Sequence, residues 1–152
     1  MMVLGMLFLS SLSIADQPVF KGSQVDEKTL AIINNSAQLI INRMGELGIP
    51  NFDYSENSVK QLSDLINSDV GKLSERGMEA SVIGYGSYFG SAVINRFGGE
   101  WVRMEDGEIF IIIDKKLRIQ PFNRVAKQLE NGEEDSIYSL YLAVEDALKK
   151  LQ

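Results

Sequence analysis

Five consecutive apolar residues, IFIII at positions 109–113, constrain the fold of this 152-residue chain more than any other segment. A strand with one face in water alternates apolar and polar residues, so an unbroken run indicates a strand covered on both faces or at the centre of a sheet. Turn residues flank the run at 105–107 (EDG) and 114–116 (DKK), and strand signals lie beyond both turns, at 101–102 and 117–120. The sequence therefore predicts a three-stranded antiparallel meander.

Helical periodicity precedes and follows this meander. Apolar residues recur at spacings of three and four through residues 26–47, which predicts a long first helix capped by Asp26. A second helix is expected around residues 59–73 and a third over residues 78–97, and two more follow the meander. The predicted fold is a single α+β domain over residues 26–152, with N-terminal helices, the meander and two C-terminal helices.

The first 25 residues differ from the domain that follows. Residues 3–12 form an uncharged, mostly apolar run that is too short to span a bilayer. Small residues precede Asp16 in the spacing of a signal-peptidase site. No Lys or Arg precedes the apolar run, which is a departure from the usual signal peptide. We predict a signal peptide over residues 1–15, cleaved after Ala15, and an extended arm over residues 16–25. The mature protein would then be periplasmic or secreted, with no stable membrane insertion. The alternative is a buried N-terminal strand or helix in a cytoplasmic protein.

Composition excludes several kinds of chemistry. The chain has neither Cys nor His, which rules out disulfides, thiol nucleophiles, Cys/His zinc sites and Ser-His-Asp triads. No calcium-binding loop pattern is present, so we expect no metal, no cofactor and no catalytic residues. The net charge of −6 and the pI of about 4.7 argue against nucleic acid as a partner and suit a basic protein partner.

The segment GYGSYFG at positions 84–90 resembles a phosphate-binding loop at first sight. Its glycines follow the spacing G-x-G-x-x-x-G, one residue longer than the dinucleotide fingerprint, and no Lys-Ser or Lys-Thr follows as in a P-loop. Each glycine inside a helix costs about 0.5–1 kcal/mol relative to alanine, which implies a steric need. We interpret Gly86 and Gly90 as positions where the helix packs closely against the sheet or the first helix. Trp101, the only tryptophan, is expected to anchor the core where this helix meets the sheet.

Two groups of acidic residues are candidate docking surfaces for a protein partner. One lies on the predicted hairpin turn and the other at a helix junction: Glu105, Asp106 and Glu108, then Glu130, Glu133, Glu134 and Asp135. The alternative is that these carboxylates only cap helices and solvate a turn. If the protein instead binds a small ligand, the candidate pocket residues are Tyr85, Tyr88 and Trp101. A carboxylate-based hydrolase would need two carboxyl groups about 5–10 Å apart across a cleft.

Two stretches, GYGSYFGSAVINRFGGEWV (84–102) and PFNRVAKQLENGEEDSIYSLY (121–141), resemble a group of small uncharacterised bacterial domains. Their pattern is a helix with G-x-Y-x-G, a Gly-rich stop, a Trp-Val strand, P-F-x-x-V and N-G-E-E-D, and the likeness covers residues 53–145. Members often carry Glu where this chain has Ser91, so any role of that Glu is missing here. The resemblance implies a fold and a bacterial origin but no activity. Some domains of this kind resemble immunity proteins that neutralise toxins from rival cells.

These observations favour a non-enzymatic exported bacterial protein that binds another protein. An immunity or inhibitor protein acting against a toxin is the most concrete form of this hypothesis. The alternatives are a small-ligand-binding periplasmic module and a carboxylate-based hydrolase.

Overall fold

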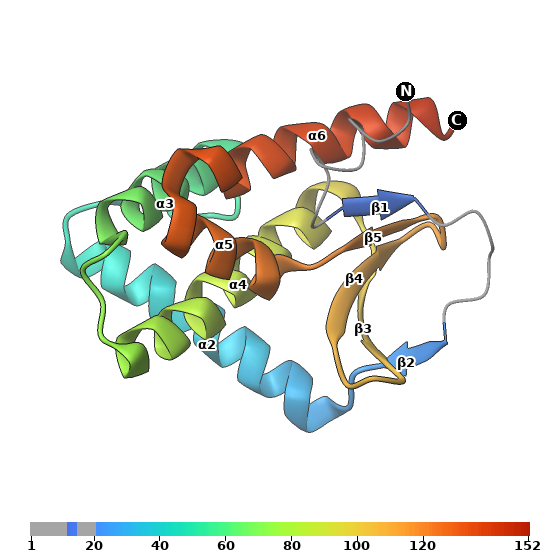
Figure 1. Cartoon of the computed structure of the whole chain (residues 1–152), viewed down its shortest axis with the longest axis horizontal. Helices are drawn as coiled ribbons and strands as arrows, with labels where there is room; N and C mark the ends of the chain where they lie inside the picture. The colour runs from blue at the N-terminus through green and yellow to red at the C-terminus, as the bar shows by residue number, and fades with distance from the viewer. Residues whose placement is uncertain (1–11, 15–20) are drawn as a thin grey trace.

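The structure is a computed structural model that describes residues 12–14 and 21–152, and it confirms the α+β architecture (Figure 1). Helices at both ends of the described domain enclose an antiparallel sheet, as the sequence predicts. The strands are β1 (Leu12–Ile14), β2 (Gly22–Gln24), β3 (Glu100–Met104), β4 (Ile109–Ile113) and β5 (Leu117–Ile119). The helices are α2 (Glu27–Glu46), α3 (Glu56–Asp69), α4 (Glu75–Phe97), α5 (Pro121–Asn131), the 3-10 helix η1 (Gly132–Asp135) and α6 (Ile137–Lys150).

The sheet has the strand order β1-β5-β4-β3-β2, with every neighbouring pair antiparallel. The predicted meander forms strands β3, β4 and β5, and the apolar run is the central strand β4. Two short strands extend the meander, because β1 pairs with β5 and β2 pairs with β3. Strand β2 lies in the expected extended arm, and β1 lies in the expected signal peptide. The rest of residues 1–20 falls outside the described residues, so cleavage after Ala15 stays a prediction.

Both faces of β4 are buried, as the unbroken apolar run predicts. Ile111 is opposite Trp101 on β3 and Ile119 on β5, and these side chains belong to the main hydrophobic core. Successive residues of a strand point to opposite faces, so Ile112 points away from that core, yet it is only 7% exposed. The non-alternating pattern thus marks a strand whose last three residues are buried on both faces, whereas Ile109 and Phe110 are half-buried.

Helix α4 is the central helix of the domain, with extensive contacts to α2 and to α5 (Figure 1). It begins at Glu75, three residues before the predicted start, because the Ser74 hydroxyl caps it by accepting a hydrogen bond from the Gly77 N–H at 3.0 Å. Asp26 caps α2 in the same way, through the Thr29 N–H at 2.8 Å. Among the described residues, no helix is long and apolar enough to cross a membrane.

Candidate functional site

The glycine-rich segment is a packing surface in the middle of α4. A Cβ atom built on Gly84 would lie 3.0 Å from Cδ1 of Ile40 on α2, and one on Gly86 would lie 2.5 Å from the Phe122 ring on α5. A Cβ on Gly90 would overlap the indole of Trp101. The helix therefore approaches α2, α5 and the sheet through these glycines. Close packing is confirmed, and Gly90 meets the sheet as predicted, but Gly86 packs against α5 and not against the sheet or the first helix. Trp101 is 5% exposed and packs on Phe122, as expected for a core anchor.

The two candidate pocket tyrosines, Tyr85 and Tyr88, are buried in the core. The Tyr88 hydroxyl donates to Oγ of Ser58 at 2.7 Å and accepts from the Tyr54 N–H at 2.8 Å. The Tyr85 hydroxyl donates to a carboxylate oxygen of Asp69 at 2.9 Å. Both side chains thus have partners within the fold, and their hydroxyls connect α4 to the loop before α3 and to the end of α3.

Buried tyrosines make the stability of the fold sensitive to alkaline pH. Burial raises the pKa of both Tyr85 and Tyr88 to about 12, with the Asp69 carboxylate adding to the shift at Tyr85. Between pH 10 and pH 12 these phenols ionise in the unfolded chain but stay neutral in the folded one, so the free energy of unfolding falls as pH rises through this window. We expect urea midpoints to decrease over that range and to decrease less steeply in Tyr88→Phe. An equal pH slope in the variant contradicts the assignment.

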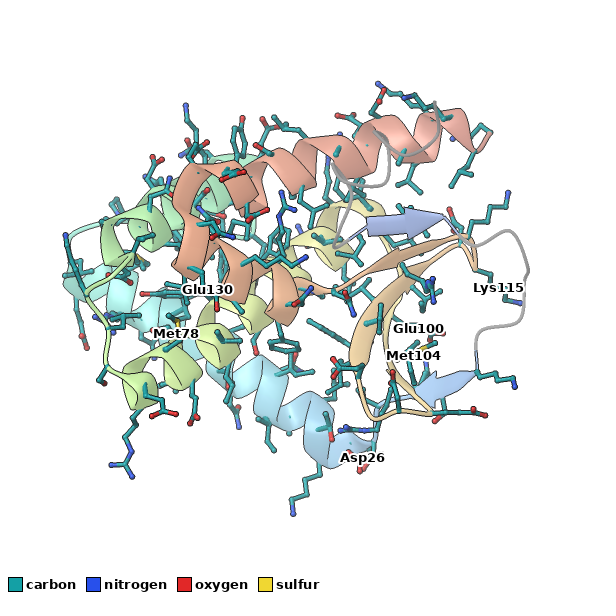
Figure 2. The ribbon with its side chains drawn as sticks, in the orientation of Figure 1. Asp26, Met78, Glu100, Met104, Lys115 and Glu130 are labelled. Carbon is teal, nitrogen blue, oxygen red and sulfur yellow. The ribbon has the colours of Figure 1, made fainter. Side chains whose placement is uncertain are left out.

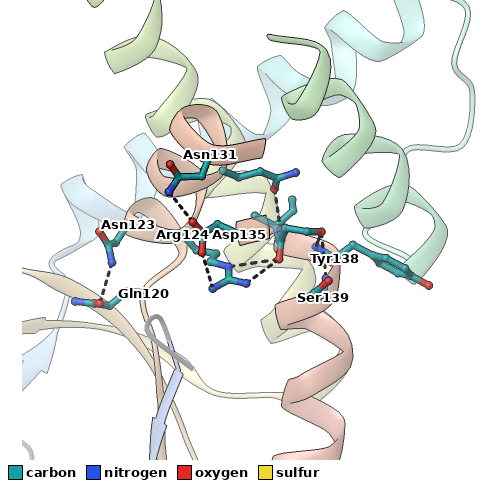
Figure 3. Close-up of polar contacts among 10 residues, drawn as sticks. Gln120, Asn123, Arg124, Asn131, Asp135, Tyr138 and Ser139 are labelled. Carbon is teal, nitrogen blue, oxygen red and sulfur yellow. Dashed lines mark hydrogen bonds and ion pairs between the residues drawn. The ribbon is translucent and has the colours of Figure 1, made fainter. Parts of the chain in front are cut away.

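The acidic group at residues 130–135 is partly engaged in the fold (Figure 3). An Asp135 carboxylate oxygen accepts from the Asn131 amide at 2.7 Å, and the other oxygen lies 3.9 Å from the Arg124 guanidinium. A Glu133 carboxylate oxygen accepts from the Asn67 amide at 2.6 Å. Glu130 and Glu134 are exposed and form no hydrogen bond or ion pair with the described residues. Two of these four carboxylates therefore serve the fold: Asp135 holds the junction after α5, and Glu133 ties η1 to α3.

Beneath this junction lies a buried polar network that the sequence analysis did not identify. The Arg124 guanidinium donates to the Ser136 carbonyl from Nε at 3.4 Å and from Nη2 at 3.2 Å, and burial lowers its pKa against the opposing effect of Asp135. The buried Gln128 side chain bonds Ser63 of α3 and the Ile137 N–H of α6. A sequence signal exists, since both polar residues occupy core-facing positions next to Val125 and Leu129 on the amphipathic α5.

The acidic hairpin between β3 and β4 is fully exposed at the other end of the domain. Glu105, Asp106 and Glu108 are all exposed, and only Asp106 has a side-chain bond among the described residues, from the Glu108 N–H at 3.0 Å. Arg103 joins this hairpin to the first turn of α2, because its guanidinium donates to the Gly107 carbonyl at 3.2 Å and to the Thr29 hydroxyl at 3.3 Å. The hairpin and the start of α2 therefore form one continuous surface.

We call this surface the acidic end. Its carboxylates come from the hairpin, the first residues of α2 and the start of β3: Asp26, Glu27, Glu100, Glu105, Asp106 and Glu108. Figure 2 shows Asp26, Glu100 and Met104 at the sheet side of the molecule, away from Glu130 and Met78. Lys21, Lys28 and Arg103 lie in the same segments, and Lys115 lines a hollow together with Glu100, so six carboxylates face four cations there. The hairpin carboxylates could be named from sequence as a docking surface. Asp26, Glu27 and Glu100 could not, because Asp26 and Glu27 stand at a helix start and Glu100 at a strand start.

A groove of about 370 Å³ opens at the acidic end. It lies between β2, β3 and the facing parts of α2 and α4, and its lining residues are Gln24, Val25, Glu27, Leu30, Ile94, Gly99, Glu100 and Trp101. Of the three candidate pocket residues, Trp101 lines this groove. Within residues 12–14 and 21–152, no three carboxylates gather closely enough to hold a metal ion.

The chain matches no protein-family model, no curated protein and no solved structure. The resemblance of residues 53–145 to small bacterial domains therefore stays a prediction from the quoted motifs.

Proposed function

We propose that this protein is an exported, non-enzymatic bacterial protein that binds a basic protein through its acidic end. A toxin neutralised by this chain is the most concrete partner. Charge supports the proposal, because a surface rich in carboxylates steers and orients a partner of opposite charge.

The observation that carries this proposal is the gathering of carboxylates at the acidic end, where Glu105 and Glu108 adjoin the carboxylates of α2 and β3, whereas at residues 130–135 only Glu130 and Glu134 lack partners among the described residues. At residues 130–135, Asp135 and Glu133 already bond to side chains of the fold. On the hairpin, the carboxylates of Glu105 and Glu108 are exposed and form no hydrogen bond or ion pair with the described residues. Unpaired exposed carboxylates keep their full charge available for a partner, whereas paired ones are already partly neutralised.

A carboxylate-based hydrolase is the second candidate, and one observation favours it. Glu27 and Glu100 line the same groove, and such chemistry needs two carboxyl groups in one cleft. Both residues are exposed, and a Glu100 carboxylate oxygen accepts a hydrogen bond from the Gln24 amide. A general acid is held neutral by burial in an apolar site, so solvent-exposed carboxylates fit catalysis less well than they fit charge recognition.

Charge reversal of the hairpin tests the proposed function. The mature protein is titrated against purified products of the neighbouring genes by calorimetry, first as wild type and then as the double variant Glu105→Lys/Glu108→Lys. We expect the variant to bind the partner at least about tenfold more weakly, and its binding to depend less on salt, because attraction becomes repulsion. The matched control, Glu130→Lys/Glu134→Lys, makes the same charge change at the other acidic group and should keep its affinity. No binding by any neighbouring product, or equal losses in both variants, contradicts the proposal.

A further inference from the structure

The groove at the acidic end combines apolar walls with a charged rim. Leu30, Ile94 and Trp101 line its sides, and Leu30 is 39% exposed although it belongs to the apolar face of α2. Glu27 lies at the start of α2 and Glu100 at the start of β3, and both line the groove. The groove thus has an exposed leucine, a tryptophan and two carboxylates at its border. Such a surface suits a side chain or small molecule that has an alkyl part and a cationic end.

The charges of the residues that line the groove are unbalanced, although Lys115 lines an adjoining hollow together with Gln24 and Glu100. Its lining residues include two glutamates and neither lysine nor arginine. The nearest cations by sequence, Lys28 and Arg103, act on another carboxylate, since both lower the pKa of Asp26 after the effect of its hydrogen bonds to Thr29. Arg103 is also held by the Gly107 carbonyl and the Thr29 hydroxyl. A positive group that enters the groove therefore meets carboxylates without a competing cation among the lining residues.

We propose that this groove binds a lysine side chain of the basic protein partner. The methylene groups of that lysine pack along Leu30, Ile94 and the edge of Trp101, and its ammonium group donates hydrogen bonds to Glu27 and Glu100. Charge-assisted hydrogen bonds of this type are stronger than neutral ones, and the apolar walls take up the alkyl part that lysine otherwise exposes. The inference rests on the proposed function, since it names where on the acidic end the partner inserts a side chain.

The size of the groove agrees with this occupant. A groove of about 370 Å³ falls within the range of small-ligand sites, which start at about 300 Å³, so one long side chain with its ammonium group has room in it. The adjoining hairpin carboxylates then face the basic surface that surrounds the inserted lysine. The hairpin contributes attraction over distance, and the groove contributes contact and orientation.

The sole tryptophan gives a direct assay, because Trp101 lines the groove and no other residue contributes indole fluorescence. The probe is n-butylammonium chloride, which copies the lysine side chain, and it is titrated into the full protein at constant ionic strength with 1-butanol as the neutral analogue. We expect saturable changes in Trp101 fluorescence, and in the amide resonances of Leu30 and Gly99, with butylammonium only. Glu27→Gln and Glu100→Gln should each weaken binding about fivefold, roughly 1 kcal/mol. Glu79→Gln, an exposed change on α4 away from the groove, should have no effect.

Each outcome decides the inference. Equal responses to butylammonium and 1-butanol, or equal affinity in the glutamine variants and the Glu79→Gln control, overturn it. No saturable response also overturns it, and thermal melts of each variant show whether the fold is intact. If butylammonium fails while hairpin charge reversal still weakens the partner, the groove inference is wrong and the proposed function stands. If butylammonium binds but no partner is found, the groove site stands as a site for alkylammonium ions and the proposed function is wrong.

Discussion

Gly90→Val is expected to destabilise the fold by about 3 kcal/mol or more, a large fraction of the stability of a typical domain. The Cβ atom alone would overlap the Trp101 indole, and Cδ1 of Ile111 would lie 3.1 Å from it. Neither neighbour can move aside cheaply, because both are buried in the core between α4 and the sheet. Urea unfolding followed by circular dichroism measures the loss. Gly90→Ala should lose less than Gly90→Val, and both should lose more than any exposed substitution.

Gly45→Val is the matched control for this prediction. Gly45 is also helical, near the end of α2, and a Cβ built there meets nothing within 4 Å. Valine has a slightly higher helix propensity than glycine, so this variant should remain within about 0.5 kcal/mol of the wild type. If Gly90→Val and Gly45→Val prove equally stable, the glycines of α4 do not serve close packing.

Much of the fold could be predicted from sequence because its strongest elements carry their own signals. The apolar run at 109–113 predicts a central strand, and the spacing of apolar residues predicts α2 and α4. The edge strands β1 and β2 carry no such signal. Each has three residues, and β2 consists of Gly22, Ser23 and Gln24, which have little strand propensity and lie in the sheet only because β3 offers an unpaired edge.

The candidate site was predictable only in part, for a similar reason. The exposed carboxylates of the hairpin lie within four residues of one another in the sequence, at 105, 106 and 108, and could be named directly. The groove joins segments near residues 24–30, 94 and 99–101, and no local pattern states that they meet. Tyr85 and Tyr88 look like pocket residues by type, but their hydroxyls bond Asp69 and Ser58 within the core. Residue type suggests a binding role, whereas burial and partners decide it.

The buried amide of Gln128 gives the other large expected effect. Its nitrogen lies 3.0 Å from both the carbonyl and the hydroxyl of Ser63, and its oxygen accepts from the Ile137 N–H at 2.8 Å, so it joins α3, α5 and α6. Gln128→Met keeps the side-chain length but leaves the buried Ile137 N–H without its acceptor and removes the amide bonds to Ser63, which should cost about 2–4 kcal/mol in urea unfolding. Gln38→Met, on the exposed face of α2, should cost less than about 0.5 kcal/mol. Equal stability of the two methionine variants would mean that the amide does not hold these three helices together. A loss confined to Gln128→Met would show that the polar residues of α5 specify how its apolar face docks on the neighbouring helices.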